Sequence, residues 1–324
     1  MLAGHIQARG KIELVDIPEP SLDGPDVSPG QILFEPHLTC LCGSDLPYFD
    51  SAHTEYPQPV GYSLHEMVGT VAATSGQRFR AGDRVLAVPI RQRGLYERYW
   101  LGEERAIPLD HRRPPEQALL AQPLGTVIFA LKKLPSVLDK DVVVVGQGPI
   151  GQLFNATLRN LGAREIIGVD KLASRLAMSP QMGATATIDS SREDPAEAVR
   201  KVTGGNLADI VVEAVGHEDQ ALDLCIDLCA KYGRILSFGV PPETIDALRW
   251  RDLFYKNITV HTSVDPDFTR DFPLAMRWIG EGRIDLAALV THRFPLAQIQ
   301  TAFETFRDRK EGAQKVLVEF PRAR

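Results

Sequence analysis

The run VVVVGQGPIGQLFNATLRNLGAREIIGVD, residues 142–170, decides the fold of this chain. An apolar strand leads directly into glycines with the spacing G-x-G-x-x-G, and an amphipathic helix follows. In such a unit the glycines permit a tight turn, close approach of the backbone to a pyrophosphate, and close packing of helix on strand. The pattern predicts a dinucleotide-binding turn made by Gly146, Gly148, Pro149, Ile150 and Gly151.

Asp170 ends the next apolar strand, where a carboxylate meets the ribose hydroxyls of a bound dinucleotide. A carboxylate at this place repels a 2′-phosphate, so the sequence favours NAD over NADP. Lys171 and Arg175 lie close by in the sequence. They either pair with a phosphate and soften this preference, or they are solvated surface charges.

Further apolar strands alternate with helical segments after residue 117, which predicts a doubly wound parallel sheet. Such sheets bind ligands at the carboxyl ends of their strands. We therefore expect Val215, Gly216 and Val240 to surround the nicotinamide ring.

Residues 1–110 have a different sequence pattern, in which Gly and Pro interrupt short β segments. This pattern predicts a β-rich, barrel-like module. The segment after residue 265 contains two helices and a closing strand, too little to form a core alone. We expect it to pack back on the N-terminal module.

The chain has 324 residues, for which two domains are the natural expectation. Its net charge of -6 and its lack of a long Lys/Arg run argue against a nucleic acid or an anionic membrane as partner. The N-terminus does not resemble a signal peptide. We expect a cytoplasmic protein that acts on a small molecule.

The four cysteines are too few for a disulfide framework in a chain of this length. Cys225 and Cys229 are one turn apart in a predicted amphipathic helix, where buried packing is the simplest interpretation. Cys40 lies two residues from Cys42 on a segment expected to be extended, and it is interpreted as a core residue.

Cys42, His65 and Glu66 offer a thiolate, an imidazole and a carboxylate. These are the ligand types that a catalytic zinc ion takes from a protein while a further position stays open for water or substrate. A chance grouping in a zinc-free protein is the alternative.

Together with the run at 142–170, these residues resemble the medium-chain dehydrogenase/reductase family, in particular its zinc-dependent alcohol, sorbitol and threonine dehydrogenase branch. The resemblance covers nearly the whole chain, including RAGDRVLAVP, GLYERYW and LVTHRFPLAQIQTAF. It implies a Rossmann doubly wound parallel sheet inserted into a β-rich GroES-like catalytic domain. The expected limits are 1–118 for the first part of the catalytic domain, 119–264 for the NAD-binding domain and 265–324 for the return segment.

The resemblance implies that Cys42 and His65 are zinc ligands and that Glu66 is a ligand or lies close beside the metal. It gives Ser44 the role of relaying a proton from the substrate alcohol, and Asp45 the role of orienting the ligand histidine.

Three further positions follow from the same resemblance. Lys315 matches a basic position near the cofactor phosphates, although a plain exposed lysine is the alternative. Gln122 stands where many relatives have an acid or a cysteine near the metal, and Pro47 replaces a histidine of the proton relay. The four-cysteine lobe of many relatives is missing between Ala81 and Glu104, so we expect one catalytic zinc ion and no structural one.

The expected reaction is hydride transfer between NAD and the hydroxyl of an alcohol, polyol or sugar, or the reverse reduction of a ketone. The alternatives are a zinc-free NAD(P)H-dependent quinone or enone reductase of the same fold and a non-catalytic NADH-binding protein. We expect a homodimer or homotetramer, built through a sheet edge at KNITVHTSV, residues 256–264.

Overall fold

The computed structural model describes residues 1–21, 27–216 and 220–321. The chain divides into two compact units. The first unit comprises Met1–Gln122, Phe272–Glu281 and Leu289–Arg324, and the second comprises Pro123–Asp271 and Gly282–Ala288. The first unit is thus built from both ends of the chain.

The second unit contains a parallel sheet with the strand order β10-β9-β8-β11-β12-β13. Its strands are β8 (Asp141–Val145), β9 (Glu165–Asp170), β10 (Ala186–Asp189), β11 (Ala208–Glu213), β12 (Cys229–Ser237) and β13 (Thr259–Thr262). Its helices are α4 (Pro149–Asn160), α5 (Ala173–Leu176), α6 (Pro195–Val202), α7 (Ala221–Leu228) and α8 (Trp250–Tyr255). The strand order reverses direction at β8, which is the point where doubly wound sheets bind their ligands.

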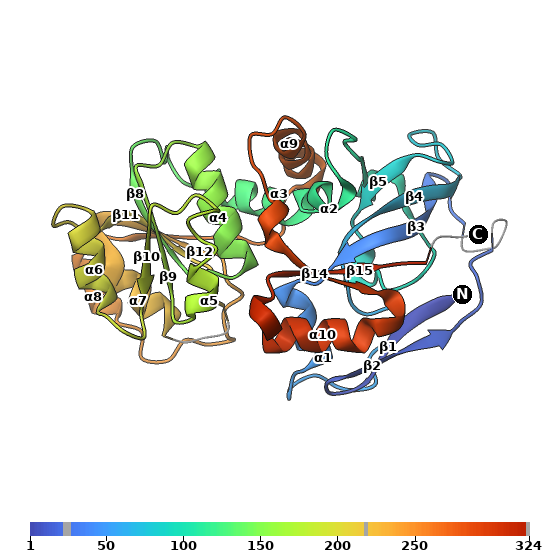
Figure 1. Ribbon diagram of the computed structural model, residues 1–324, viewed down its shortest axis with the longest axis horizontal. Coiled ribbons are helices and arrows are strands. Elements are labelled where there is room, and N and C mark those ends of the chain that lie inside the picture. The colour runs from blue at the N-terminus through green and yellow to red at the C-terminus, as the bar shows by residue number, and fades with distance from the viewer. Residues whose placement is uncertain (22–26, 217–219, 322–324) are drawn as a thin grey trace. The chain divides into compact units, whose positions relative to one another are not determined.

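Helices cover both faces of this sheet, with α4 and α5 on one face and α6 and α7 on the other (Figure 1). Every residue of β8 is buried, as its unbroken valine run predicts for a strand covered on both faces.

The first unit contains a mixed sheet in the order β14-β15-β3-β4-β5-β7, with β6 paired to β3, and a separate hairpin of β1 and β2. The strands are β1 (Leu2–Ala8), β2 (Lys11–Asp16), β3 (Gln31–Cys40), β4 (Glu66–Thr74), β5 (Arg84–Ala87), β6 (Tyr99–Gly102), β7 (Ala106–Pro108), β14 (Val290–Pro295) and β15 (Lys315–Glu319). The helices are α1 (Leu46–Phe49), α2 (Pro115–Ala118) and α10 (Ile299–Asp308). The expected fold class, a Rossmann sheet together with a β-rich domain, is confirmed.

Two helices run from one unit into the other. They are α3 (Ala121–Leu131) and α9 (Phe268–Gly280). Because α9 begins in the second unit, that unit extends to Asp271 in this part of the chain.

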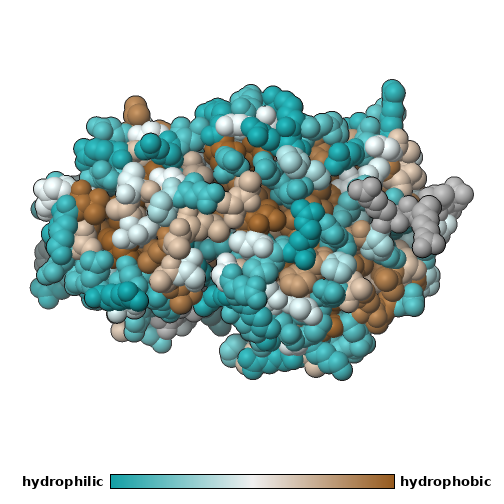
Figure 2. Space-filling model, viewed as in Figure 1, coloured by the Kyte–Doolittle hydropathy of each residue, from teal (hydrophilic) through white to brown (hydrophobic). Residues whose placement is uncertain are grey.

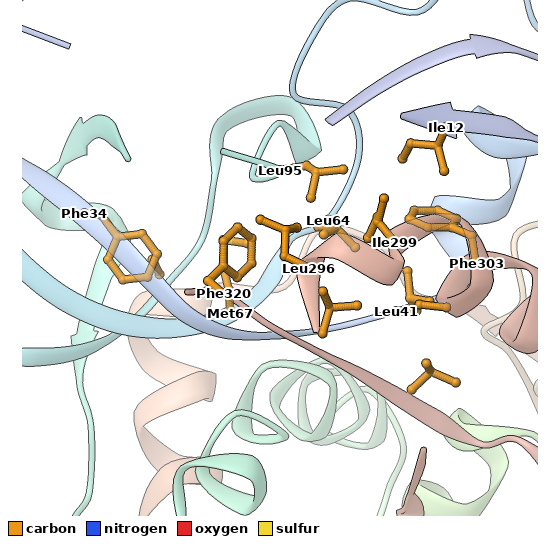
Figure 3. Close-up of a cluster of buried hydrophobic side chains, with 14 of the residues drawn as sticks. Ile12, Phe34, Leu41, Leu64, Met67, Leu95, Leu296, Ile299, Phe303 and Phe320 are labelled. Carbon is orange, nitrogen blue, oxygen red and sulfur yellow. The ribbon is translucent and has the colours of Figure 1, made fainter. Parts of the chain in front are cut away.

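The core of the first unit lies between its sheet and helix α10. Figure 3 shows Leu296, Ile299 and Phe303 beside Leu41 and Leu64 from the strand ends. The return segment therefore supplies part of this core, as expected from its small size.

One expected helix ends earlier than its sequence pattern suggests. Helix α7 stops at Leu228, and Cys229 has extended dihedral angles and opens β12. The Nζ atom of Lys256 donates hydrogen bonds to the carbonyl oxygens of Ile226, at 2.6 Å, and of Cys229, at 3.0 Å. A cation at the end of a helix satisfies carbonyl groups that have no partner within the helix. The helical placement of Cys229 is therefore wrong, whereas its burial is as expected.

No helix in the described part of the chain is long and apolar enough to cross a membrane. On the face that Figure 2 presents, hydrophobic residues are scattered between hydrophilic ones.

Candidate metal and dinucleotide sites

The register of the first unit's sheet brings the proposed metal donors together. Cys40, the last residue of β3, pairs with Glu66, the first residue of β4. Cys42 follows β3 and His65 precedes β4, so both lie at the same edge of the strand pair. One donor atom from each of Cys42, His65 and Glu66 lies within 4.8 Å of the others.

A core leucine fixes the chain immediately before each of the first two donors. Leu41 precedes Cys42, Leu64 precedes His65, and both leucine side chains are fully buried in the cluster of Figure 3. Leu64 also has a positive φ of 76°, which turns the chain sharply before His65. Positive φ is unfavourable for a residue with a β-carbon, so the packing of Leu64 must offset that cost.

Asp45 ties the two donor segments to each other. Its Oδ2 accepts a hydrogen bond from the Cys42 backbone N–H at 2.8 Å, and its Oδ1 accepts one from the Leu64 N–H at 3.0 Å. Oδ1 also lies 3.5 Å from Nδ1 of His65. A carboxylate behind a ligand histidine fixes the orientation of the ring and leaves Nε2 for the metal.

The two ionisable partners shift each other's pKa. Burial acts to raise the pKa of Asp45, but the His65 imidazole beside it and the backbone N–H group of Cys42 hold that pKa below its usual value. Burial acts to lower the pKa of His65, but Asp45 and Cys42 raise it well above its usual value. Ser44 Oγ lies 3.5 Å from His65 Nε2, beside the nitrogen that would hold a metal ion.

Lys315 lies in the interior of the first unit, next to the proposed metal donors. Leu317 of β15 pairs with Cys40, which brings Lys315, the first residue of that strand, opposite Cys42. The Lys315 side chain is 1% exposed, and its Nζ donates to Glu66 Oε1 at 2.7 Å and to Oε2 at 2.6 Å. Lys315 is therefore not a plain exposed lysine, because its ammonium group is buried against a carboxylate, and its place near the cofactor phosphates stays a prediction.

This pair balances a charge that burial would otherwise make costly. Glu66 is fully buried, and a buried charge needs a partner. Burial acts to lower the pKa of Lys315, but the charge of Glu66 raises it above its usual range, so the lysine is a cation. Gln122, the second residue of α3, is buried as well.

The glycine-rich turn of the second unit has the geometry that its sequence predicts. Gly146 has a φ of +91°, and a β-carbon at Gly151 would lie 1.9 Å from the Gly146 carbonyl oxygen. Only glycine fits at that contact. Pro149 and Ile150 open helix α4, so the free N–H groups at its start face the end of strand β8.

Asp170 supports this turn with both carboxylate oxygens. Oδ2 accepts a hydrogen bond from the Gln147 N–H at 2.8 Å, and Oδ1 accepts one from the Leu172 N–H at 2.9 Å. Arg175 Nη1 lies 3.6 Å from Oδ2. A β-carbon at Gly148 would lie 3.5 Å from the Arg175 guanidinium carbon, so this arginine stands at the turn itself. Lys171 is exposed next to Asp170.

Strand β11 ends at Glu213, a buried carboxylate whose role was not predicted from the sequence. Its Oε1 accepts hydrogen bonds from the N–H groups of Val215 at 2.7 Å and Gly216 at 2.8 Å, and its Oε2 accepts one from Gly239 at 3.1 Å. One side chain thus holds the loops after β11 and β12, and Val215 and Val240 on these loops are exposed. The acidic residue at the end of the apolar run DIVVE is the feature of the sequence from which this role could have been predicted.

A second missed feature is a buried polar cluster beneath the turn. Gln147 Oε1 accepts hydrogen bonds from Asn155 Nδ2 and from Ser179 Oγ, each at 2.7 Å. Gln152 Nε2 donates to the backbone carbonyl of Gln147 at 3.0 Å. Polar residues on the buried face of α4 were the signal for this cluster.

Two family models and several known proteins are similar to this chain. Residues 28–105 match the alcohol dehydrogenase GroES-like domain, and residues 149–281 match the zinc-binding dehydrogenase family. An L-threonine 3-dehydrogenase of Bacillus velezensis is 25% identical over 87% of this chain and 90% of its own length. A sorbitol dehydrogenase of Rattus norvegicus is 26% identical over 93% of this chain and 91% of its own length.

The fold is also shared with solved structures. An alcohol dehydrogenase from Thermus sp. ATN1 has a TM-score of 0.85 with 24% identity, covering 99% of this chain and all of the other. At that identity the likeness shows the fold. Taken with the two family matches and the donor set, it leads to one assignment. The chain belongs to the zinc-binding dehydrogenases of the medium-chain dehydrogenase/reductase family.

Proposed function

We propose that this dehydrogenase transfers a hydride between NAD and the secondary hydroxyl of an alcohol, polyol or sugar, at a zinc ion held by Cys42, His65 and Glu66. The observation that carries the proposal is the approach of three donor atoms within 4.8 Å, with Asp45 behind the histidine. The similarity to a sorbitol dehydrogenase supports a polyol as substrate.

The donor set fits zinc because thiolate, imidazole and carboxylate are its usual protein ligands. The chemistry that a bound zinc ion supplies is Lewis acidity, which lowers the pKa of a coordinated hydroxyl group. Gln122 is proposed as a neighbour of the metal whose amide is a weaker ligand than a carboxylate.

The chain's own residues then have distinct tasks. Asp45 keeps His65 oriented. Ser44, beside His65 Nε2, relays the proton of the substrate hydroxyl, because its own hydroxyl proton passes to water or to the cofactor ribose as it accepts the new one. Lys315 compensates the charge of Glu66, so this carboxylate faces a cation whether or not it also binds metal.

On the cofactor side, the turn from Gly146 to Gly151 is proposed to bind the pyrophosphate. Val215, Gly216 and Val240 are proposed to line the nicotinamide, which supplies the hydride acceptor. Asp170 supports a preference for NAD, which Arg175 moderates because it lies 3.6 Å from the same carboxylate.

The test is metal analysis combined with an assay of NADH absorbance over a panel of alcohols and polyols. We expect about one zinc ion per chain, lost together with activity in Cys42→Ser and His65→Ala, because removing one of so few ligands opens the site. The pairing of Glu66 with Lys315 favours one second candidate, a zinc-free reductase of quinones or enones. A fully active metal-free preparation would establish that candidate instead.

We further propose a homodimer or homotetramer assembled through β13. This strand is the edge of the described sheet, and its Val260 is exposed, as is Val264 just after it. An edge strand with exposed apolar side chains is a ready template for pairing with a second copy. Light scattering that gives only a monomer at micromolar concentration would contradict this proposal.

We propose the cytoplasm as the compartment because all four cysteines are free thiols. Unpaired cysteines suit a reducing environment.

A further inference from the structure

A short loop with two arginines, Ile90–Arg93, leaves strand β5 beside the metal donors. We call it the arginine loop. Strand β5 pairs with β4 so that its last residue, Ala87, lies opposite Met67. Met67 is the residue after Glu66, so the chain that leaves β5 emerges next to the donor set.

The arginine loop then returns along the segment that carries His65. Arg93 forms a parallel β-bridge with Ser63, and the Gly94 N–H donates to the Ser63 carbonyl oxygen at 3.2 Å. A β-carbon at Gly94 would lie 2.6 Å from the Leu64 carbonyl oxygen, so the two backbones are in direct contact. Both ends of the loop are thus fixed to the residues that flank the donors.

The middle of the loop is strained and incompletely bonded. Arg91 and Gln92 have φ values of 51° and 56°, a left-handed conformation that is unfavourable for residues with a β-carbon. The Oε1 atom of Gln92 is buried and has no hydrogen-bond partner among the described residues. Backbone strain and unsatisfied buried acceptors are both enriched where a ligand completes the structure.

The loop also carries uncompensated positive charge. Arg91 and Arg93 are both exposed, and neither forms an ion pair with a carboxylate in the part of the chain that the structure describes. Arg98, a few residues further on, instead pairs with Glu19 at 3.3 Å and with Glu35.

Aromatic contacts link Arg93 to the residues around the proposed metal. Its Nη2 donates to the Val60 carbonyl oxygen at 2.9 Å, and its guanidinium carbon lies 5.8 Å from the centre of the Tyr62 ring. The Tyr62 ring lies 4.9 Å from that of Tyr48, which is one helical turn beyond Ser44. Two ring contacts thus link the guanidinium group of Arg93 to the short helix that follows Ser44.

We propose that the arginine loop binds an anionic group, a phosphate or a carboxylate, at the end of the substrate remote from the reacting hydroxyl. The inference rests on the proposed function, because it names the class of alcohol that the same site takes. Arginine forms paired, charge-assisted hydrogen bonds with the oxygens of both anions. A hydroxyl near the anion can donate to Gln92 Oε1. The substrate class is therefore an acidic polyol, such as a polyol phosphate or a sugar acid.

The test compares substrates matched in carbon chain. A pentitol, its phosphate monoester and the aldonic acid of the same length are assayed with NAD on wild type, on Arg91→Gln/Arg93→Gln and on Arg84→Gln. Arg84 is an exposed arginine at the start of β5, three residues from its metal-side end, and controls for net charge. We expect wild type to prefer one of the two anions over the neutral pentitol by at least tenfold in kcat/KM. The double variant should lose at least tenfold of that preference and Arg84→Gln less than twofold.

Which of the two anions is preferred identifies the acidic group as phosphate or carboxylate. A wild type that uses the neutral pentitol as well as both anions overturns the inference and leaves the proposed dehydrogenase function intact. If no compound is turned over, titration calorimetry with the same compounds measures their binding directly. If wild type binds an anion and the double variant does not, the inference is supported even though the proposed reaction fails. If wild type binds neither anion, the inference is overturned. Arg93→Lys, with thermal melting alongside, separates loss of binding from loss of folding.

Discussion

The Lys315 ammonium group lies 2.6 Å from the Glu66 carboxylate in the interior of the first unit, with both side chains almost fully buried. This ion pair includes one of the three proposed metal donors, Glu66, and β15 places Lys315 opposite a second, Cys42. The site is therefore held together by a charge pair as well as by the hydrophobic core.

Lys315→Met should destabilise the metal-free protein strongly. Removing one partner leaves the Glu66 charge buried and unpaired, which costs about 3–5 kcal/mol. Glu66→Gln combined with Lys315→Met should recover much of that loss, because no buried charge then remains. Urea unfolding of the single and double variants measures the loss of unfolding free energy and its recovery.

Arg293→Met is the matched control for that experiment. Arg293 and Glu319 lie 2.7 Å apart on the neighbouring strands β14 and β15 of the same sheet, but each side chain is 45% exposed. Exposed pairs contribute about 0–1 kcal/mol. Equal losses in Lys315→Met and Arg293→Met would show that the buried pair has no special role.

Thiol reagents should distinguish Cys42 from the other three cysteines. Cys40, Cys225 and Cys229 are buried, whereas Cys42 is partly exposed. Burial raises the pKa of Cys225 well above its usual value and that of Cys229 to about 12, so neither thiol forms the reactive thiolate at pH 8. Iodoacetamide at pH 8, followed by peptide mass spectrometry, should label Cys42 first in metal-free protein.

Added zinc should protect Cys42 from the same reagent, because a metal-bound thiolate is no longer free to react. Labelling of Cys225 or Cys229 as fast as Cys42 in folded protein would contradict their placement in the core.

The sequence predicted those features of the sites that depend on local pattern. Strand, glycines and helix lie next to each other between residues 142 and 170, so the dinucleotide turn could be recognised without tertiary information. The donor types of Cys42, His65 and Glu66 were equally visible. Their convergence depends on the pairing of Cys40 with Glu66, which no local signal specifies.

Lys315 and Glu213 show why the remainder could not be predicted. Lys315 lies 249 residues from Glu66, and only the register of β15 brings the two together. In the sequence, Glu213 is an acidic residue at the end of a strand like many others. Its role depends on its hydrogen bond with Gly239, which lies 26 residues further on in the loop after β12. Long-range register and loop closure are properties of the assembled fold.

Arg175→Ala should make the enzyme more selective for NAD. Without Arg175 the Asp170 charge lacks its compensating cation and repels a 2′-phosphate more strongly. Contacts with a charged group are worth about 1.5–3 kcal/mol, which corresponds to a change of about tenfold or more in the ratio of kcat/KM for NAD and NADP. Kinetics with both cofactors measure the ratio, and Arg251→Ala, an exposed arginine on α8, is the control.

Asp170→Ala should shift that ratio towards NADP by a similar factor. It should also raise KM for both cofactors, because the N–H groups of Gln147 and Leu172 lose their acceptor. A wild type that favours NADP would show that Arg175 and Lys171 bind the extra phosphate and that Asp170 does not govern the choice.

Glu213→Gln should weaken cofactor binding more than it weakens the fold. The amide group keeps one acceptor oxygen and directs an NH₂ group at backbone N–H donors, so the loops after β11 and β12 lose their shared support. We expect KM for NAD to rise about tenfold, with about 1–3 kcal/mol lost from the free energy of unfolding. Asp141→Asn is the matched control, because Asp141 is also buried and bonded, to Arg164, but lies at the opposite end of the parallel strands. It should lose comparable stability and keep the KM of wild type. If the two variants changed KM equally, Glu213 would be a structural residue and not one that positions the cofactor loops.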